Sequence, residues 1–261
     1  MDLDHGVLHS ALAVFWRRMR TPQANRESGS IDPVNTLLHA NPDILAFAYF
    51  VASVVGYQII TGSPSLERRS IVGAVQVQRE RWMRNMATRD QRIVDAHLLG
   101  GLSQGNAFFA STSALIVGGL TAMMGSGEKV QALLEQIPHV AKASPVLFEL
   151  KLLLLIGIFV YAFFKFAWAF RLSHYAAIMI GSTPLLDDAN TDTCERHALR
   201  TARLIGIAAE HANGGLRSFY YAVAAMTWFF HPLALVAGTT WVILVMIRRE
   251  FFSRSRYLIA E

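Results

Sequence analysis

Two ionisable side chains stand inside long apolar segments of this sequence. Lys165 interrupts the otherwise uncharged stretch 152–170, and His231 precedes a proline near the centre of another uncharged stretch, 218–247. Ionisable groups inside a membrane-spanning helix are candidates for binding a ligand or relaying a proton. Lys165 has the alternative of extending its ammonium to the membrane surface along its four-carbon side chain. His231 has the alternative of a hydrogen bond within the bundle. For each of the two residues, the sequence therefore leaves both a functional and a structural role open.

Small polar side chains form a third candidate feature. Ser103, Asn106 and Ser113 share one face at helical spacing within a segment that is otherwise apolar. Gly101 and Gly105 form a small-x-x-x-small pair, which lets two helix backbones approach closely. Such a face either joins helices or lines a polar path, and we expect it to face the interior of a bundle.

Familiar enzyme and cofactor chemistry is not indicated. The sequence contains neither H-E-x-x-H nor G-x-S-x-G nor a P-loop. Its single cysteine, Cys194, excludes an intramolecular disulfide and any zinc or iron–sulfur site built from several cysteines. Haem ligation by two histidines needs ligands at similar depth, whereas His231 is central and His97, His174 and His211 lie near predicted helix ends. We therefore expect no enzyme of a familiar type, no metal and no cofactor.

Four apolar segments must position these side chains. The chain has 261 residues, of which 53% are hydrophobic and 16% charged, too apolar a composition for an ordinary soluble domain. No Asp, Glu, Lys or Arg occurs at 44–66, 96–127 or 218–247, and 152–170 contains only Lys165. A helix needs about 20 apolar residues to cross a bilayer. The pattern predicts an all-α polytopic membrane protein, a four-transmembrane-helix bundle with basic amphipathic connecting helices.

The predicted domains follow from these segments. Residues 1–42 form an N-terminal extension that begins with the pattern of an amphipathic helix on the membrane surface. Residues 43–250 form the transmembrane domain, and residues 251–261 form a basic C-terminal tail. We expect the spans at about 43–61, 100–124, 147–171 and 217–246, the last kinked at Pro232.

Two connecting segments are basic and amphipathic. Residues 65–95 carry seven arginines and an apolar stripe that includes Trp82 and Met86, and residues 195–209 carry arginines along one side. Such helices typically lie on the membrane surface, where arginine attracts anionic headgroups. The formal net charge is +5, but no basic patch is interleaved with stacking aromatics, so we expect no nucleic acid as a partner.

The distribution of lysine and arginine hardly decides the topology. If all four segments cross, twelve of these residues lie on one side and ten on the other. A hairpin folded at His231–Pro232 would place sixteen on one side and six on the other, but its turn would need shielding from lipid. We favour the through-crossing, with the arginine-rich connectors in the cytoplasm and both termini outside.

Several ordered strings resemble the bacterial and plant multi-pass membrane family catalogued as domain of unknown function 599. The resemblance covers roughly residues 45–255. The strings that carry it are RWMRNM at 81–86, RIVDA at 92–96, FFAST at 108–112, FELKL at 148–152, VYAFFKF at 160–166, GLR at 215–217, the tyrosines 220 and 221, and HP at 231–232.

The resemblance implies an integral membrane protein and supplies no activity, substrate or catalytic residue. It does select polar positions for testing, because these lie in or beside the matching strings. The candidate positions are Arg81, Trp82, Asn85, Asp95, Asn106, Glu149, Lys165, Arg217 and His231.

Two functions from different classes fit these features. The first is a non-enzymatic membrane module whose basic amphipathic helices engage anionic lipid or a protein partner. The alternative is a transporter or channel for an ion or small solute, built from the polar face around Asn106 with Lys165 and His231. Four helices would need further copies to enclose such a path, so a homo-oligomer is a candidate assembly. The high arginine content is typical of a GC-rich bacterial genome, so we expect a bacterial inner membrane.

Overall fold

The structure is a computed structural model that describes residues 42–63, 66, 69–126, 144–184 and 191–260. The chain divides into two compact units, Met1–Ala40 and Asn41–Glu261, and every described helix belongs to the second unit. The surface helix predicted near the N-terminus lies outside the described residues.

The described residues form helices and turns, with no strand among them. In chain order the elements are α3 (Pro42–Thr61), α5 (Ile71–Ala87), α6 (Ile93–Gly125), α8 (Pro145–Gly181), α9 (Thr191–Met226), the 3-10 turn η1 (Thr227–Phe229), α10 (Pro232–Phe251) and α11 (Arg254–Ala260). Four helical segments are long and apolar enough to cross a membrane, namely α3, α6, α8 and α10 with its continuation α11. The predicted all-α fold with four apolar helices is therefore confirmed.

Local sequence explains where α8 begins. The hydroxyl of Ser144 accepts a hydrogen bond from the backbone N–H of Leu147, the usual role of a serine that caps a helix N-terminus. Pro145 follows, and its fixed φ and missing N–H suit the first helical position. This defined start sets the residue at which α8 begins, and with it the register of the side chains along the helix.

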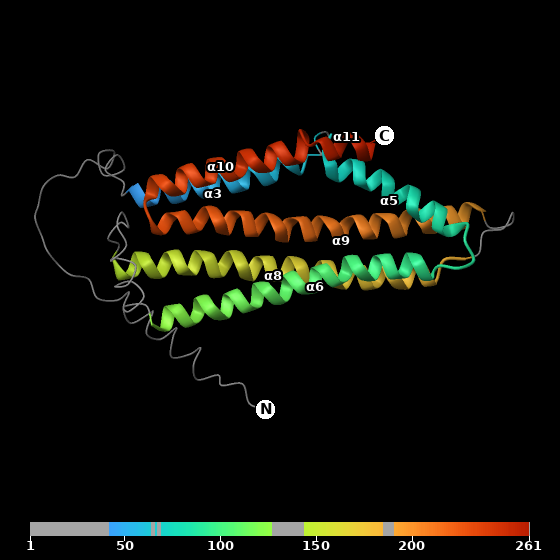
Figure 1. The fold of residues 1–261 in the computed structure, drawn as a ribbon, viewed down its shortest axis with the longest axis horizontal. Coiled ribbons are helices and arrows are strands. Elements are labelled where there is room, and N and C mark those ends of the chain that lie inside the picture. The colour runs from blue at the N-terminus through green and yellow to red at the C-terminus, as the bar shows by residue number, and fades with distance from the viewer. Residues whose placement is uncertain (1–41, 64–65, 67–68, 127–143, 185–190, 261) are drawn as a thin grey trace, which may run out of the picture. The chain divides into compact units, whose positions relative to one another are not determined.

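Helices α6, α8 and α9 are longer than a bilayer is thick. α8 has 37 residues and α9 has 36, each about 55 Å at a rise of about 1.5 Å per residue, against about 30 Å of hydrocarbon. Figure 1 shows α3 and α10 side by side along one half of these helices, with α5 and α11 along the other half. We call the part that contains α3 and α10 the apolar half, and the part that contains α5 and α11 the basic half.

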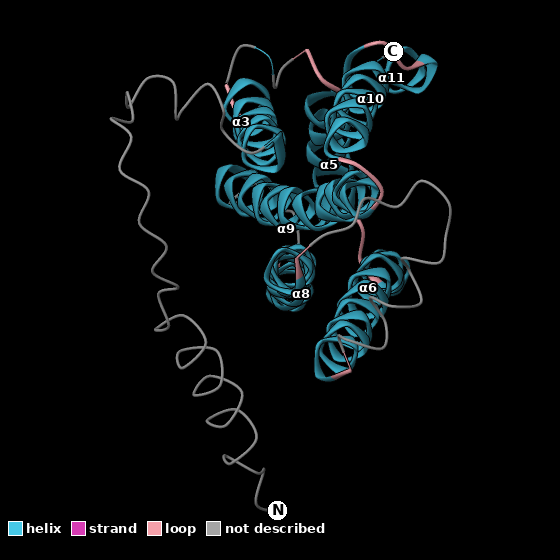
Figure 2. Ribbon diagram, turned by 90° about the vertical axis from the view of Figure 1, so that its left-hand side faces the viewer, coloured by secondary structure: helices cyan, strands magenta, loops and turns pink. Residues whose placement is uncertain are grey.

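Helix α9 is central to the described bundle. Figure 2 shows α8 and α6 on one side of α9, and α3, α5 and α10 on the other side. Each half has its own buried cluster: Phe50, Leu155 and Leu235 belong to the one in the apolar half, and Met86 and Ala198 to the one in the basic half. Because α9 contributes residues to both clusters, it connects the apolar half to the basic half.

The predicted fourth span, 217–246, is wrong as a single crossing helix. α9 ends at Met226, and α10 starts at Pro232 and returns along α9 (Figure 1). His231 has an extended backbone, with φ −162° and ψ 147°, and its Nδ1 accepts a hydrogen bond from the N–H of Leu233 at 3.1 Å. Proline at a first helical position begins a new helix, so Pro232 starts α10 instead of kinking a longer helix.

The hairpin also corrects the predicted position of the C-terminus. Gln78 of α5 donates a hydrogen bond to the backbone carbonyl of Ile259 in α11 at 2.8 Å. The C-terminal helix therefore lies on the same side as the arginine-rich α5, and the C-terminus does not share a side with the start of α3.

The segment 195–209 is the first half of α9 and is not a helix on the membrane surface. Its apolar side, including Ala202 and Ile205, is buried against Met83 and Met86 of α5. The apolar stripe of α5 thus packs on protein, because the first half of α9 offers it a complementary apolar surface. Both basic helices are consequently parts of one helical bundle.

Candidate functional site

The predicted position Asp95 has a structural environment. Its side chain is fully buried at the start of α6, where the indole Nε1 of Trp82 donates to Oδ1 at 2.7 Å and Arg89 approaches the same oxygen at 3.2 Å. A buried carboxylate with two donors is stabilised in place. Asp95 therefore joins α5 to α6. Two of the candidate positions on α5, Arg81 and Asn85, are exposed.

Most other arginines near α5 are committed to protein contacts. Arg84 pairs with Glu195 of α9 at 3.2 Å, and Arg92 donates to the backbone carbonyls of Thr183 and Pro184. Burial lowers the pKa of Arg79, and the nearby carboxylate of Glu210 opposes that shift; these residues face each other across α5 and α9. The basic character of α5 thus serves largely to attach this helix to the bundle.

Arg217 forms an ion pair at the border between the two halves. Its guanidinium lies 3.3 Å from Oε2 of Glu250 on α10 and 3.5 Å from the hydroxyl of Thr61 on α3, and it stacks over the ring of Tyr57 at 5.4 Å. A small polar cavity of about 230 Å³ adjoins this cluster, with Gln58 in its wall. Arg217 therefore ties three helices together where α3 ends.

His231 is not near the middle of the membrane, contrary to the prediction. It is exposed in the turn between η1 and α10, where its ring caps α10. Lys165 lies on α8 near the basic half, while this turn lies at the opposite end of the apolar half (Figure 1). The structure therefore does not bring His231 and Lys165 together in one polar path.

The polar face of α6, predicted to face the interior of the bundle, does so only in part. Ser103 and Ser113 are buried, and Ser113 donates to the carbonyl of Phe109 at 2.8 Å, while Asn106 is half-buried. The glycines at 101 and 105 are exposed, and a β-carbon at either would meet no atom within 4 Å. The expected close approach at this glycine pair is therefore absent from the described bundle.

Sequence reasoning missed Lys151, which is only 2% exposed in the first turns of α8. Its ammonium donates to the carbonyl of Trp228 at 2.9 Å and lies 3.7 Å from Oδ1 of Asp43. The indole of Trp228 donates to the same Asp43 oxygen at 2.8 Å and lies under the ammonium at 5.2 Å. The sequence signal that could have predicted this ion pair was a lysine near the start of one predicted span and an aspartate at the start of another.

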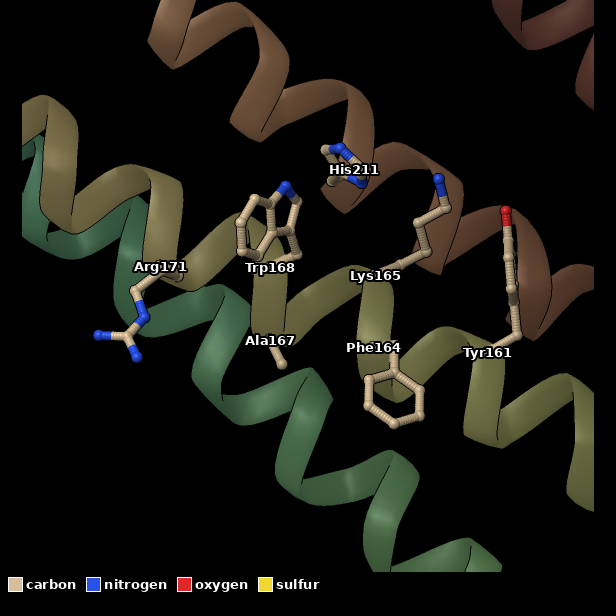
Figure 3. Close-up of a pocket in the computed structure, with 7 residues that line it drawn as sticks. All are labelled: Tyr161, Phe164, Lys165, Ala167, Trp168, Arg171 and His211. Carbon is tan, nitrogen blue, oxygen red and sulfur yellow. The ribbon is translucent and has the colours of Figure 1, made fainter.

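Lys165 lies in a shallow trough of about 610 Å³ on the outer face of α8 (Figure 3). Its ammonium lies 5.4 Å from the ring centre of Tyr161, and a β-carbon at Gly214 of α9 would lie 3.5 Å from its Cε. The aliphatic part of the side chain therefore passes over bare backbone. We call this site the Lys165 trough, and its lining residues are Tyr161, Phe164, Lys165, Ala167, Trp168, Arg171 and His211.

The trough has the composition of an anion site at a membrane surface. Figure 3 shows Tyr161, Lys165 and Trp168 directed toward α9, where His211 faces them, and Arg171 at the far end of the trough with its side chain directed away from α9. Lys165 lies 20 residues after Pro145, about 30 Å along the helix, which is the thickness of the hydrocarbon region. Among the described residues, no carboxylate lies within ion-pair distance of Lys165 or Arg171.

Metal binding has no support in the described part of the chain. No group of three or more His, Cys, Asp or Glu side chains there is arranged to hold a metal ion. Cys194 is buried, and its thiol lies 3.6 Å from the carbonyl of Pro184.

Comparison with known proteins identifies a family without an assigned activity. A family model described as "Protein of unknown function, DUF599" matches residues 45–255, which include every candidate position. No curated protein and no solved structure matches the chain. The match covers most of the chain and confirms the resemblance found in the sequence, so the protein belongs to the DUF599 family.

Proposed function

We propose that this membrane protein is a non-enzymatic module that binds anionic lipid at its basic half. The observation that carries the proposal is the Lys165 trough, where Lys165 and Arg171 lie among aromatic rings with no carboxylate partner in the described residues. Cations beside aromatic rings at the depth of the membrane surface suit the phosphate of a lipid headgroup.

The charge of α9 supports the same side for lipid binding. Arg196, Arg200 and Arg203 are exposed, and helical spacing places them on the side of α9 that carries His211. Because most arginines near α5 are held by protein contacts, the cations of α8 and α9 join the exposed arginines of α10 and α11 in supplying charge that is available to lipid. The proposal therefore keeps the basic side of 195–209 that the sequence pattern favoured, and it replaces the connector 65–95 by α8.

The helical hairpin supports an orientation with the basic half in the cytoplasm. With α10 returning along α9, the tail arginines join those of α5, the arrangement for which the sequence predicts sixteen lysines and arginines against six. The positive-inside rule favours the more basic side as cytoplasmic. In a bacterial inner membrane, our preferred location, that leaflet carries anionic lipid at its surface.

Solute transport receives less support as the alternative function. Its proposed path needs Asn106, Lys165 and His231 together, and the described bundle separates Lys165 from His231 by the apolar half. A homo-oligomer would rearrange none of these contacts within one chain. Lipid binding requires only the side chains that already share the Lys165 trough.

Melting in lipid nanodiscs tests the proposed function. The purified protein is reconstituted in phosphatidylcholine alone or with phosphatidylglycerol, and we expect the anionic lipid to raise the Tm by about 5 °C, because a bound ligand stabilises the folded state. High salt should reduce that gain, since screening weakens exposed charge pairs. Equal Tm values in the two lipids at low salt would overturn the proposal.

A further inference from the structure

An apolar groove adjoins the Lys165 trough on the side toward the apolar half. It has a volume of about 460 Å³ and lies where α3 and α8 flank α9. We call it the α3–α8–α9 groove. It is lined by Val54, Gln58, Leu153, Leu154, Gly157, Ile158, Tyr161, Ser218 and Tyr221.

The trough and the groove form one path along α8. Tyr161 lines both, with Leu153, Gly157 and Ile158 before it and Lys165 after it on the same face of the helix. On α9, residues 211, 214, 218 and 221 follow each other at spacings of three and four, so they share the facing side. The path therefore runs from the surface of the membrane into its hydrocarbon region.

Two glycines, which have no side chain, leave the path open. Gly157 is exposed, and a β-carbon there would meet no atom within 4 Å. Gly214 leaves room for the aliphatic part of Lys165, which directs the ammonium along the trough. An apolar depression beside an open glycine accommodates methylene groups, while the polar end accommodates a charged group.

The charges at the polar end select an anion. The ammonium of Lys165 can contact a phosphate where the path ends, and Arg171, at the far end of the trough, adds positive charge to the same surface. The carboxylate next along the chain from His211, that of Glu210, acts on Arg79 and lines the separate polar cavity. That carboxylate therefore belongs to another surface of α9.

We propose that this path holds one anionic glycerophospholipid, with its phosphate at Lys165 and one acyl chain in the α3–α8–α9 groove. The inference rests on the proposed function and adds a defined site and ligand to it. Residues Leu153 to Lys165 cover about 18 Å along α8, close to the thickness of one leaflet of hydrocarbon. One lipid in the leaflet next to the basic half thus matches the path in both polarity and length.

Filling the groove tests the acyl-chain contact. Delipidated protein in detergent is titrated with phosphatidylglycerol, and bound lipid is counted by native mass spectrometry. Wild type should hold one lipid per chain, and Gly157→Leu should weaken binding about tenfold, because leucine displaces about two bound methylene groups. The matched control is Gly118→Leu on α6, an exposed glycine whose added β-carbon also meets no atom within 4 Å.

Removing charge tests the headgroup contact. Lys165→Gln should weaken phosphatidylglycerol binding about tenfold, which corresponds to about 1.4 kcal/mol, because it removes the charge-assisted contact to the phosphate. It should weaken phosphatidylcholine less, since that headgroup has no net charge. The control, Arg248→Gln, removes the same charge from an exposed position outside the path and should bind like wild type.

The outcomes separate this inference from the proposed function. If Gly157→Leu and Gly118→Leu bind phosphatidylglycerol equally while that lipid still raises the wild-type Tm, the defined site is overturned and general anionic-lipid binding stands. Displacement of the lipid by inorganic phosphate would likewise overturn the acyl-chain contact. If phosphatidylglycerol leaves the wild-type Tm unchanged, the proposed function itself fails.

Discussion

Two lysines on α8 occupy opposite situations. Lys151 is 2% exposed and lies 3.7 Å from Asp43 and 2.9 Å from the carbonyl of Trp228. Lys165 is half-buried at the edge of a trough and has no carboxylate partner among the described residues. Each ammonium lies over an aromatic ring, that of Trp228 at 5.2 Å or Tyr161 at 5.4 Å, so the ring contact does not distinguish them.

The difference shows what decides whether a cation in an apolar helix stabilises the fold or can bind a ligand. A buried ammonium requires a compensating charge and hydrogen bonds, because it has lost its water. Lys151 obtains both from other parts of the chain, so its bonds hold α3, α8 and η1 together. Lys165 reaches the membrane surface, where water or a lipid phosphate provides the counterpart.

Breaking the Lys151 pair should have the largest effect. Lys151→Met leaves Asp43 without its cation and the Trp228 carbonyl without its donor, so we expect a loss of about 2 kcal/mol or more. Chemical denaturation of the protein in phosphatidylcholine nanodiscs measures this change. Lys165→Met is the matched control and should change the free energy of unfolding by less than about 0.5 kcal/mol in the same uncharged lipid.

A double-mutant cycle shows whether the pair acts as a unit. Asp43→Asn combined with Lys151→Met should destabilise less than the sum of the two single changes, by about 1 kcal/mol or more, because each single change leaves one group uncompensated. Additive effects would show that Lys151 is held by the carbonyl and the ring of Trp228 without Asp43, and the comparison between the two lysines would lose its basis.

Asp95 extends the comparison to the basic half, with a somewhat smaller effect. Asp95→Asn removes the charge that Arg89 neutralises and weakens the bond from Trp82, so we expect a loss of about 1 to 3 kcal/mol, localised to α5. Hydrogen exchange should show faster exchange of the α5 amides. The exposed neighbour changed by Asp90→Asn is the control, and equal exchange in both variants would contradict a structural role for Asp95.

The sequence was sufficient for the fold class because four charge-free segments are a direct consequence of burial in lipid. It could not decide the path at Pro232, since a proline can kink a helix or begin one, and because the charge counts of twelve and ten were almost equal. The hairpin depends on η1 and on α10 packing along α9 and α3, which no local pattern contains.

The candidate site was predictable only in part, for a related reason. Lys165 was selected because a charge in an apolar segment is visible in the sequence. Its lack of a partner was not visible, since that depends on Gly214 and His211 of α9. Lys151 was missed because its partner Asp43 lies in a different helix, so the pair exists only in the folded chain.

Giving Lys165 a carboxylate partner should have the smallest effect on stability and sharpens the comparison most. In His211→Glu the new carboxylate faces the Lys165 ammonium across the trough, so Lys165 acquires what Lys151 already has. The free energy of unfolding should change by less than about 1 kcal/mol, because the pair lies at the membrane surface. The Tm gain from phosphatidylglycerol should fall, since the carboxylate competes with the lipid phosphate. His97→Glu adds the same charge at an exposed position on α6 outside the trough lining, so it controls for net charge and should keep most of the gain. An equal loss in both variants would mean that overall charge, and not the unpaired state of Lys165, attracts the lipid.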